Sequence, residues 1–181
     1  MLWYLVRVGF LLLWQSWFKK PADPSTPFRV PMRAWPWHCD AYRHLNNSAY
    51  LRLAEDARWA WTARTPLLRR AITDGWVFLV GGVSILYRHE IRLMSRFEVV
   101  CRLIGADERW LYFAQEFVLP NGKVASRALI RATIRAKKAI VNPQQVAEAS
   151  GFAIPSAGEE VERLKALSEL QLASFSAERA V

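Results

Sequence analysis

Residues 37–50 read WHCDAYRHLNNSAY, and this stretch decides how the rest of the chain is interpreted. A strand-like run ends in an acid, Asp40, and His44 follows four residues later. Asn46 and Asn47 then open a predicted helix, since an asparagine side chain accepts a hydrogen bond from the unpaired N–H groups of a first helical turn. A carboxylate, an imidazole and a helix N-terminus therefore converge. This combination suits chemistry on a carbonyl group, because an acid or base lies beside a dipole that stabilises a developing oxyanion.

The segment resembles the signature of hotdog-fold thioesterases of the 4-hydroxybenzoyl-CoA thioesterase type. The residues that fall on this pattern in register are Asp40, His44, Asn46, Asn47, Tyr50, Glu55, Ala57 and Arg58. The chain departs from the pattern at His38, where the family has another aspartate, and at Arg43, where it has glycine. The likeness is closest to the group of thioesterase superfamily member 6, which shares the opening WYLVR of residues 3–7, and it extends to about Ile134.

The resemblance implies a catalytic role for Asp40. Its carboxylate would act as the general base that activates water, or as the nucleophile that attacks a thioester, and the sequence leaves both routes open. His44 is the second candidate. Plant acyl-carrier-protein thioesterases look similar here, with the pattern D-x-N-x-H, but Tyr42 replaces their asparagine. The structural alternatives are an Asp40 that only stabilises a turn and a His44 that binds backbone.

Glu90 is the third catalytic candidate. Residues 87–90 (YRHE) resemble a Tyr-Arg-Arg-Glu element of the plant enzymes, whose glutamate helps to activate water. In a hotdog dimer Glu90 could act on the partner subunit's Asp40, whereas the alternative is a charged residue on a solvated strand face. Asn46, Asn47 and Tyr50 are the candidates for binding the substrate or its thioester oxygen, although caps alone would explain both asparagines.

Other chemistries are weaker. His38, Asp40 and His44 have a spacing that strand and helix-start geometry does not bring together for a metal, so no metal site is predicted. A Cys39 nucleophile is disfavoured, since the neighbouring Asp40 opposes its thiolate. Ester-type hydrolysis by a nucleophile elbow is excluded, because residues 82–86 (GVSIL) lack the second glycine of that motif. The implied reaction needs no cofactor.

Composition is consistent with a single domain plus extensions. The chain has 181 residues, 52% of them hydrophobic, which is enough for a substantial core. Its two cysteines do not indicate a disulfide framework. The 25 Lys and Arg against 16 Asp and Glu give a net charge of +9, for which an anionic membrane or the phosphates of coenzyme A are expected partners. Nucleic acid is not expected, since no helix-turn-helix or RNA-binding pattern stands out.

The first 20 residues form an apolar segment that is expected to associate with a membrane. Residues 1–18 are almost wholly apolar and are followed by Lys19 and Lys20. As a helix they would be about 27 Å long, which is marginal for a bilayer core of about 30 Å. The lysine pair places the following domain on the cytoplasmic side, and the alternative is an apolar helix that packs on a cytoplasmic domain or its dimer. Residues 21–27, with three prolines, form a linker.

The remaining pattern predicts an α+β hotdog domain over residues 28–140. The expected elements are a strand over 28–38, a buried helix from Asn47 to about Arg64, a helical turn over 67–73, and strands over 76–93, 97–104, 111–119 and 124–134. The glycines at 81–82 predict a bulge and residues 120–123 (PNGK) a hairpin turn. An antiparallel sheet wrapped around one long helix is the physical outcome. Residues 141–181 are expected to be a tail with a helix from Glu159 to about Leu172.

These observations predict a homodimeric thioesterase-like protein that hydrolyses acyl-CoA or acyl-carrier-protein substrates. The membrane-seeking N-terminus favours a long acyl chain. The alternative is a catalytically weak or inactive hotdog protein at a membrane that binds acyl chains or scaffolds partners, and the departures at His38, Tyr42 and Arg43 favour it. A hydratase on the same fold fits least, because the spacing from Asp40 to His44 is one residue short for its dyad.

Overall fold

The computed structural model describes residues 6, 9, 23–24, 26–137 and 139–178, with side chains to residue 171. Its elements follow one another in the order β1 (Phe28–Arg33), η1 (Pro36–His38), α2 (Asn47–Ala63), α3 (Leu67–Thr73), β2 (Trp76–Tyr87), β3 (Arg96–Ala106), β4 (Leu111–Val118), β5 (Val124–Ala136), β6 (Ala139–Val141), α4 (Pro143–Ser150) and α5 (Glu159–Glu178). The predicted helices over 47–64 and 67–73 are confirmed.

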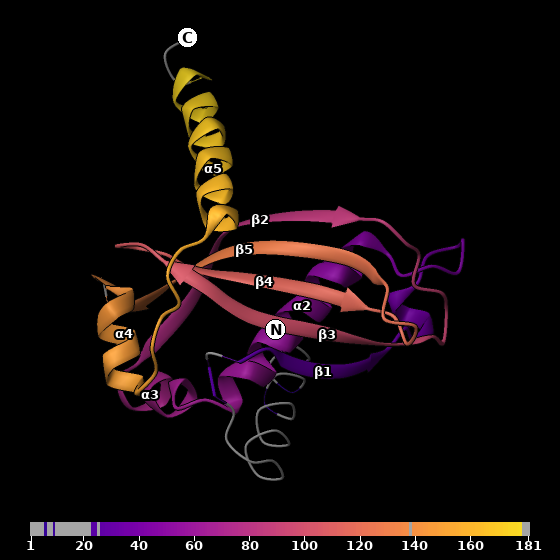
Figure 1. Ribbon diagram of the computed structural model, residues 1–181, viewed down its shortest axis with the longest axis horizontal. Helices are drawn as coiled ribbons and strands as arrows, with labels where there is room; N and C mark the ends of the chain where they lie inside the picture. The colour runs from indigo at the N-terminus through magenta and orange to yellow at the C-terminus, as the bar shows by residue number, and fades with distance from the viewer. Residues whose placement is uncertain (1–5, 7–8, 10–22, 25, 138, 179–181) are drawn as a thin grey trace.

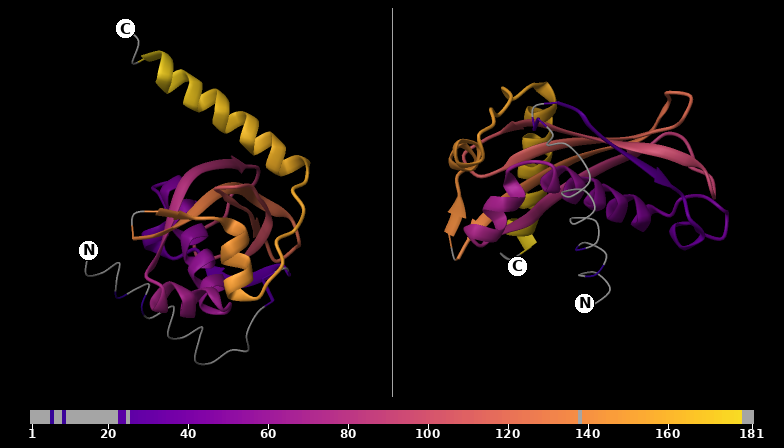
Figure 2. Two further views of the ribbon diagram at one scale, coloured as in Figure 1. Left: turned by 90° about the vertical axis from the view of Figure 1, so that its left-hand side faces the viewer. Right: turned by 90° about the horizontal axis from the view of Figure 1, so that it is seen from below.

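One antiparallel sheet forms the body of the molecule. Its strand order is β1-β3-β4-β5-β2, and β6 pairs with β5. The sheet curls around α2, which lies in its concave face (Figure 1; Figure 2, right). This arrangement confirms the predicted hotdog fold. In the described part of the chain β2 has a single neighbouring strand, β5, so that β1 and β2 are the two edges of the main sheet.

The core lies between α2 and the inner face of the sheet. Small residues let the helix approach the strands closely, since Ala54, Ala57 and Ala60 are almost completely buried. Large rings fill the remaining space: Trp61 packs edge-on against Phe113, at 5.3 Å between ring centroids, and Phe97 stacks on Phe117 at 5.9 Å. Burial of this kind, more than the intrinsic helix propensity of the residues, is the main source of stability for a helix in a folded protein.

Two predicted strands end earlier than expected. β1 ends at Arg33, and Pro36 begins the 3₁₀ turn η1, because proline fixes φ and cannot donate to a sheet ladder. β2 ends at Tyr87, and residues 88–95 connect it to β3 without regular secondary structure. The predicted bulge is confirmed by a register shift between Val80 and Gly82. A Cβ at Gly81 would lie 2.2 Å from the indole of Trp110, so a larger residue there would force that ring to move.

The C-terminal region packs more extensively than a tail. Val146 of α4 is fully buried in the main core, so the folded unit extends past residue 140. α5 begins at Glu159, as predicted, but continues to Glu178. Its Val161 and Leu164 pack on Tyr112 at the outer face of the sheet, and the rest of the helix extends away from the domain (Figure 2). Leu129 and Arg127 of β5 also contact this helix region, so the outer face of β5 is partly covered.

The predicted membrane-associated segment, residues 1–20, lies outside the described residues except for positions 6 and 9. Among the helices that are described, none has the length and apolarity needed to cross a bilayer.

Candidate active site

Residues 40–44 form a tight turn between η1 and α2. The backbone N–H of Asp40 donates to the carbonyl of His44 at 2.9 Å, and Arg43 N–H donates to the Asp40 carbonyl at 3.0 Å. The Asp40 carboxylate oxygen Oδ1 accepts from Tyr42 N–H at 3.0 Å and from His44 N–H at 3.3 Å. Asp40 therefore organises the turn with one oxygen, as the structural alternative required, while its side chain stays exposed to solvent. A turn role and a chemical role are compatible at this residue.

The structure brings His44 and Glu90 together within one chain. His44 Nε2 lies 2.7 Å from Glu90 Oε2, and both side chains are about 40% exposed (38% and 41%). Residues 88–95 pass beside the turn. Leu45 N–H donates to the carbonyl of Ile91 at 2.8 Å, and His44 pairs with Arg92 in an isolated β-bridge. This crossing places Glu90 beside the turn.

Arg92 holds Glu90 in its ionised form. The guanidinium donates to Glu90 Oε1, and this hydrogen bond is the main cause that keeps the pKa of Glu90 below its ordinary value. Desolvation opposes it, and the charges of Arg92 and His44 add to the lowering of the pKa. An ionised carboxylate only accepts hydrogen bonds, so the Nε2 atom of His44 carries a proton in this contact.

The helix-start residues divide between capping and core packing. Asn46 caps α2, with its Oδ1 accepting from Ser48 N–H at 2.9 Å and from the Ser48 hydroxyl at 2.7 Å. Asn47 is the exposed first residue of the helix. Tyr50, one turn later, is buried with its ring 4.9 Å from those of Tyr87 and Phe117. Burial, with a smaller contribution from Tyr87, raises the pKa of Tyr50 to about 12. Tyr50 is thus a protonated core residue at the edge of the site.

His38 and Cys39, the residues of the rival metal and thiol chemistries, lie just before the turn. His38 belongs to the 3₁₀ turn, where its Nδ1 accepts weakly from Trp35 N–H at 3.4 Å. Within the described residues, no group of three His, Cys, Asp or Glu side chains is placed to hold a metal ion. Burial, followed by the charge of Asp40, raises the pKa of the Cys39 thiol, which disfavours the thiolate that a nucleophile needs.

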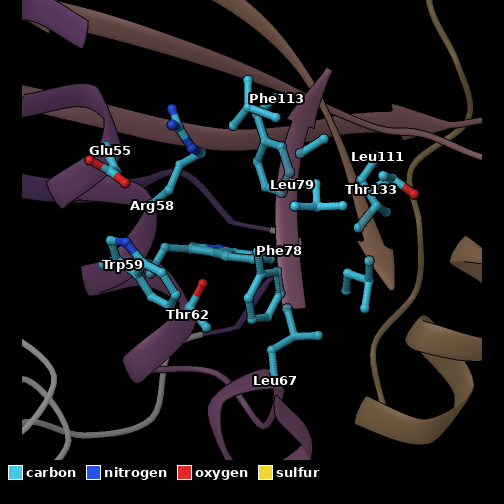
Figure 3. Close-up of a pocket in the computed structure, with 14 residues that line it drawn as sticks. Glu55, Arg58, Trp59, Thr62, Leu67, Phe78, Leu79, Leu111, Phe113 and Thr133 are labelled. Carbon is cyan, nitrogen blue, oxygen red and sulfur yellow. The ribbon is translucent and has the colours of Figure 1, made fainter. Parts of the chain in front are cut away.

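A groove lies between α2, from its second turn at Leu51 to Arg58, and the edge strand β2. It is lined by Leu51, Arg52, Ala54, Glu55, Arg58, Val80, Val83 and Ile130. It shares Glu55, Arg58 and Val80 with an apolar pocket of about 110 Å³ farther along α2. Figure 3 shows this pocket between α2, which carries Trp59 and Thr62, and the strands, with Leu67 of α3 at one end. Asn47 and Trp59 are twelve residues apart, or about 18 Å along the helix.

Two residues of this region were not predicted from the sequence. Arg92 follows Glu90 by two positions. In the strand predicted over 76–93, side chains at this spacing share a face, so the sequence could have indicated that the two residues interact. Gln115 is completely buried, accepts from Arg58 Nη1 at 2.7 Å and donates to the carbonyl of Ala54 at 2.9 Å. Gln115 alternates with the core residues Phe113 and Phe117 along β4. A polar residue at a position on the apolar face of a strand could have marked it in the sequence. Arg58, a motif residue, therefore ties α2 to β4.

Comparison with known proteins agrees with this architecture. The family model described as thioesterase-like superfamily matches residues 34–152. The chain is 35% identical over 133 residues to the protein THEM6 of Xenopus laevis, a match that covers 71% of this chain and 62% of that protein. It is 28% identical over 95 residues to the long-chain acyl-CoA thioesterase FadM of Escherichia coli, covering 52% and 72% of the two chains. The chain thus spans less than two thirds of the length of its THEM6 relatives.

Solved structures show the same fold. The crystal structure of YbaW, a probable thioesterase from Escherichia coli, superposes with a TM-score of 0.63 at 22% sequence identity, covering 67% of this chain and 94% of YbaW. Residues 34–152, which the family model matches, contain the turn, α2 and strands β2 to β6. The family model covers well over half of the 181 residues. The chain therefore belongs to the thioesterase-like superfamily.

Proposed function

We propose that this protein hydrolyses long-chain acyl-CoA thioesters at the turn that precedes α2. The observation that supports the proposal is the order of features along α2: the Asp40 turn and the contact of His44 with Glu90 lie before its N-terminus, and an apolar groove and pocket follow from Leu51 onward. A thioester held at the helix start would direct its acyl chain along the groove toward Trp59 and Phe78. The naming of a long-chain acyl-CoA thioesterase among the relatives agrees with this substrate class.

The reaction requires activation of water and stabilisation of an oxyanion. In the route that we favour, Asp40 accepts a proton from water as the hydroxide adds to the carbonyl carbon, and the N-terminus of α2 stabilises the oxygen that becomes negative. The tetrahedral intermediate then collapses, the C–S bond breaks, and the thiolate of coenzyme A takes up the proton. His44, whose Nε2 lies 2.7 Å from Glu90, would pass that proton. Nucleophilic attack by Asp40 through an anhydride is the second route, and it uses the same residues.

A homodimer would complete the groove. β2 has an edge without a neighbouring strand in the described part of the chain, and it exposes Val77, Leu79, Val80, Val83, Leu86 and Tyr87. An apolar edge strand of this length readily pairs with another strand. We propose that two copies pair through β2, which would cover the apolar side chains and close the open side of the groove. The apolar residues 1–20 would hold the dimer on the cytoplasmic side of a membrane.

The alternative is a binding or scaffolding protein without useful turnover. One carboxylate oxygen of Asp40 already accepts two hydrogen bonds within its own turn. Arg43 and Tyr42 replace the glycine and asparagine of related motifs. These observations favour acyl-chain binding without hydrolysis, and activity separates the two functions.

The test is release of free thiol from acyl-CoAs of increasing chain length, comparing the protein with Asp40→Asn. Asparagine keeps an oxygen that can accept both turn hydrogen bonds, so the variant removes the charge and preserves the fold. A general base typically contributes about 10²–10⁴-fold, and we expect kcat/KM to fall by at least about 100-fold. Asp74→Asn, on the exposed end of α3, is the matched control and should retain full activity. Equal activity of Asp40→Asn would reject the site, and absence of activity across the panel would favour the binding function.

A further inference from the structure

β1 stops at the right-hand end of the molecule in Figure 1, and the segment that follows it carries several exposed aromatic residues. Trp35 is 40% exposed, Trp37 69%, Tyr42 81% and Met94 43%. The two indoles stack on each other, with 5.5 Å between ring centroids and an interplanar angle of 12°. Scattered apolar residues on a surface are ordinary, but four large ones from two separate segments form a patch that requires an explanation. We call this patch the aromatic tip.

Backbone hydrogen bonds hold the two segments of the aromatic tip together. Ala34 N–H donates to the carbonyl of Ser95 at 3.0 Å, and Met94 N–H donates to the carbonyl of Ala34 at 2.7 Å. Leu93 N–H donates to the carbonyl of Arg43 at 2.8 Å. The tip is therefore a built surface on the rim of the sheet.

Arginines surround the aromatic tip. The guanidinium of Arg33 lies 5.6 Å from the ring centroid of Trp35, and Arg33 stands directly opposite Arg96 in the pairing of β1 with β3. Like charges at opposed positions of a sheet destabilise it. The acids nearby are Asp40, which serves its turn, and Glu90, which pairs with Arg92 and His44. With Arg43 added, the tip presents an excess of positive charge.

Two residues of the tip hold a backbone conformation that favours glycine. Arg43 has φ of 62° and Met94 has φ of 64°. This left-handed region is unfavourable for residues with a Cβ, and glycine would relieve the strain. The chain instead keeps a cation at one position and an apolar side chain at the other. Strain retained at an exposed site is a sign that the side chains serve a function besides folding.

We propose that the aromatic tip docks on the surface of an anionic lipid bilayer. Indole, phenol and thioether groups suit the boundary between acyl chains and headgroups, where one end of the ring is apolar and the other is wet. Arg33, Arg43 and Arg96 would contact the lipid phosphates, which guanidinium groups bind in a bidentate manner. The proposal does not depend on hydrolysis, although docking here would bring the Asp40 turn to the membrane.

Two other occupants fit the aromatic tip less well. Single-stranded nucleic acid stacks its bases on open aromatic faces, whereas the ring of Trp35 is already in contact with Trp37 and with the Arg33 guanidinium. A second copy of this chain has a better partner surface at β2, which is at the other edge of the sheet from β1. A bilayer uses the outward edges of the rings and needs no matching shape.

The test is a fluorescent probe placed at the tip of the full-length chain. Tyr42→Cys in a Cys39→Ser background carries an environment-sensitive label, since the remaining Cys101 is buried. Vesicles of phosphatidylcholine with or without phosphatidylserine contain spin-labelled lipid as the quencher. We expect quenching at position 42 that depends on phosphatidylserine, and no quenching of the same label at Ile72→Cys on the exposed face of α3. These two positions differ in location and have similar exposure.

Charge and aromatic variants sharpen the test. Arg43→Gln and Arg96→Gln should each weaken the quenched state by about fivefold, because one arginine near an anionic surface contributes about that factor. Trp37→Ser should weaken it as well, whereas Arg69→Gln with Arg135→Gln removes two exposed charges elsewhere and should leave the quenching at position 42 almost unchanged.

The proposal would be overturned if the label at position 42 were not quenched while the chain is bound to vesicles through another segment. Equal quenching at positions 42 and 72, or quenching that ignores phosphatidylserine, would also overturn it. Displacement of the tip from vesicles by a short oligonucleotide, with loss of oligonucleotide binding in Arg43→Gln, would assign the surface to nucleic acid instead.

Discussion

The two ends of α2 have opposite characters. At its N-terminus, Asp40, Asn46 and Asn47 are exposed, and hydrogen bonds within a short stretch of chain hold them. Farther along the helix, Trp61 is almost completely buried and packs on Phe113, and the apolar pocket lies beside them. The comparison indicates that the polar end can change its chemistry with little effect on the fold. The apolar end couples any change in the pocket to stability.

The strongest test of this comparison is Trp61→Ala against Trp37→Ala. Loss of a buried indole removes its packing and leaves a cavity, and we expect the free energy of unfolding to fall by about 3–5 kcal/mol. The same change at the exposed Trp37 should alter it by less than about 0.5 kcal/mol. Denaturant titration measures both. If the two losses were similar, the apolar end of α2 would not be the core that the structure indicates.

Filling the pocket should change chain-length preference without affecting the chemistry. Leu79 lines the pocket from β2 and is partly exposed, so Leu79→Trp can occupy the space at a modest cost in stability. We expect kcat/KM for long-chain acyl-CoA to fall by about tenfold or more, in the range that a few methylene groups contribute to binding, and that for short chains to change little. A uniform loss across chain lengths in a variant that keeps the oligomeric state of the unmodified protein would mean that the acyl chain does not enter this pocket.

The smallest expected effect is the pH dependence of stability that Glu90 contributes. Its pKa is lowered in the folded state from a usual 4.5, so the unfolded chain takes up a proton first as pH falls. The contribution is fully present above the unfolded value and is lost as pH falls through the folded one. Unfolding of the protein and of Glu90→Gln should therefore differ slightly at neutral pH and converge in acid. Because Glu90 is exposed, added salt should reduce the difference. A difference that grows in acid would contradict the contact with Arg92.

The sequence predicted the elements whose causes are local. Asn46 before an apolar segment predicted the start of α2 within one residue, and the Asn-Gly pair predicted a hairpin turn, where Gly122 has φ of 81°. The adjacent glycines predicted the bulge in β2. The early end of β2 at Tyr87 was missed, since residues 88–93 are held in their crossing by backbone bonds to Ala125 of β5 and to the turn, both far away in sequence.

The candidate site shows the same division. Asp40, His44, Asn46 and Asn47 were identified from the sequence because helix capping and the family motif both operate over a few residues of chain. The contact of His44 with Glu90 and the role of Arg92 depend on a segment more than forty residues later, brought there by the pairing of the strands. The buried bond between Arg58 and Gln115 and the exposure of the aromatic tip have the same origin. Local hydrogen bonding and periodicity determined the helices, turns and motif, whereas side-chain burial and partners depend on which distant segments the folded sheet brings together.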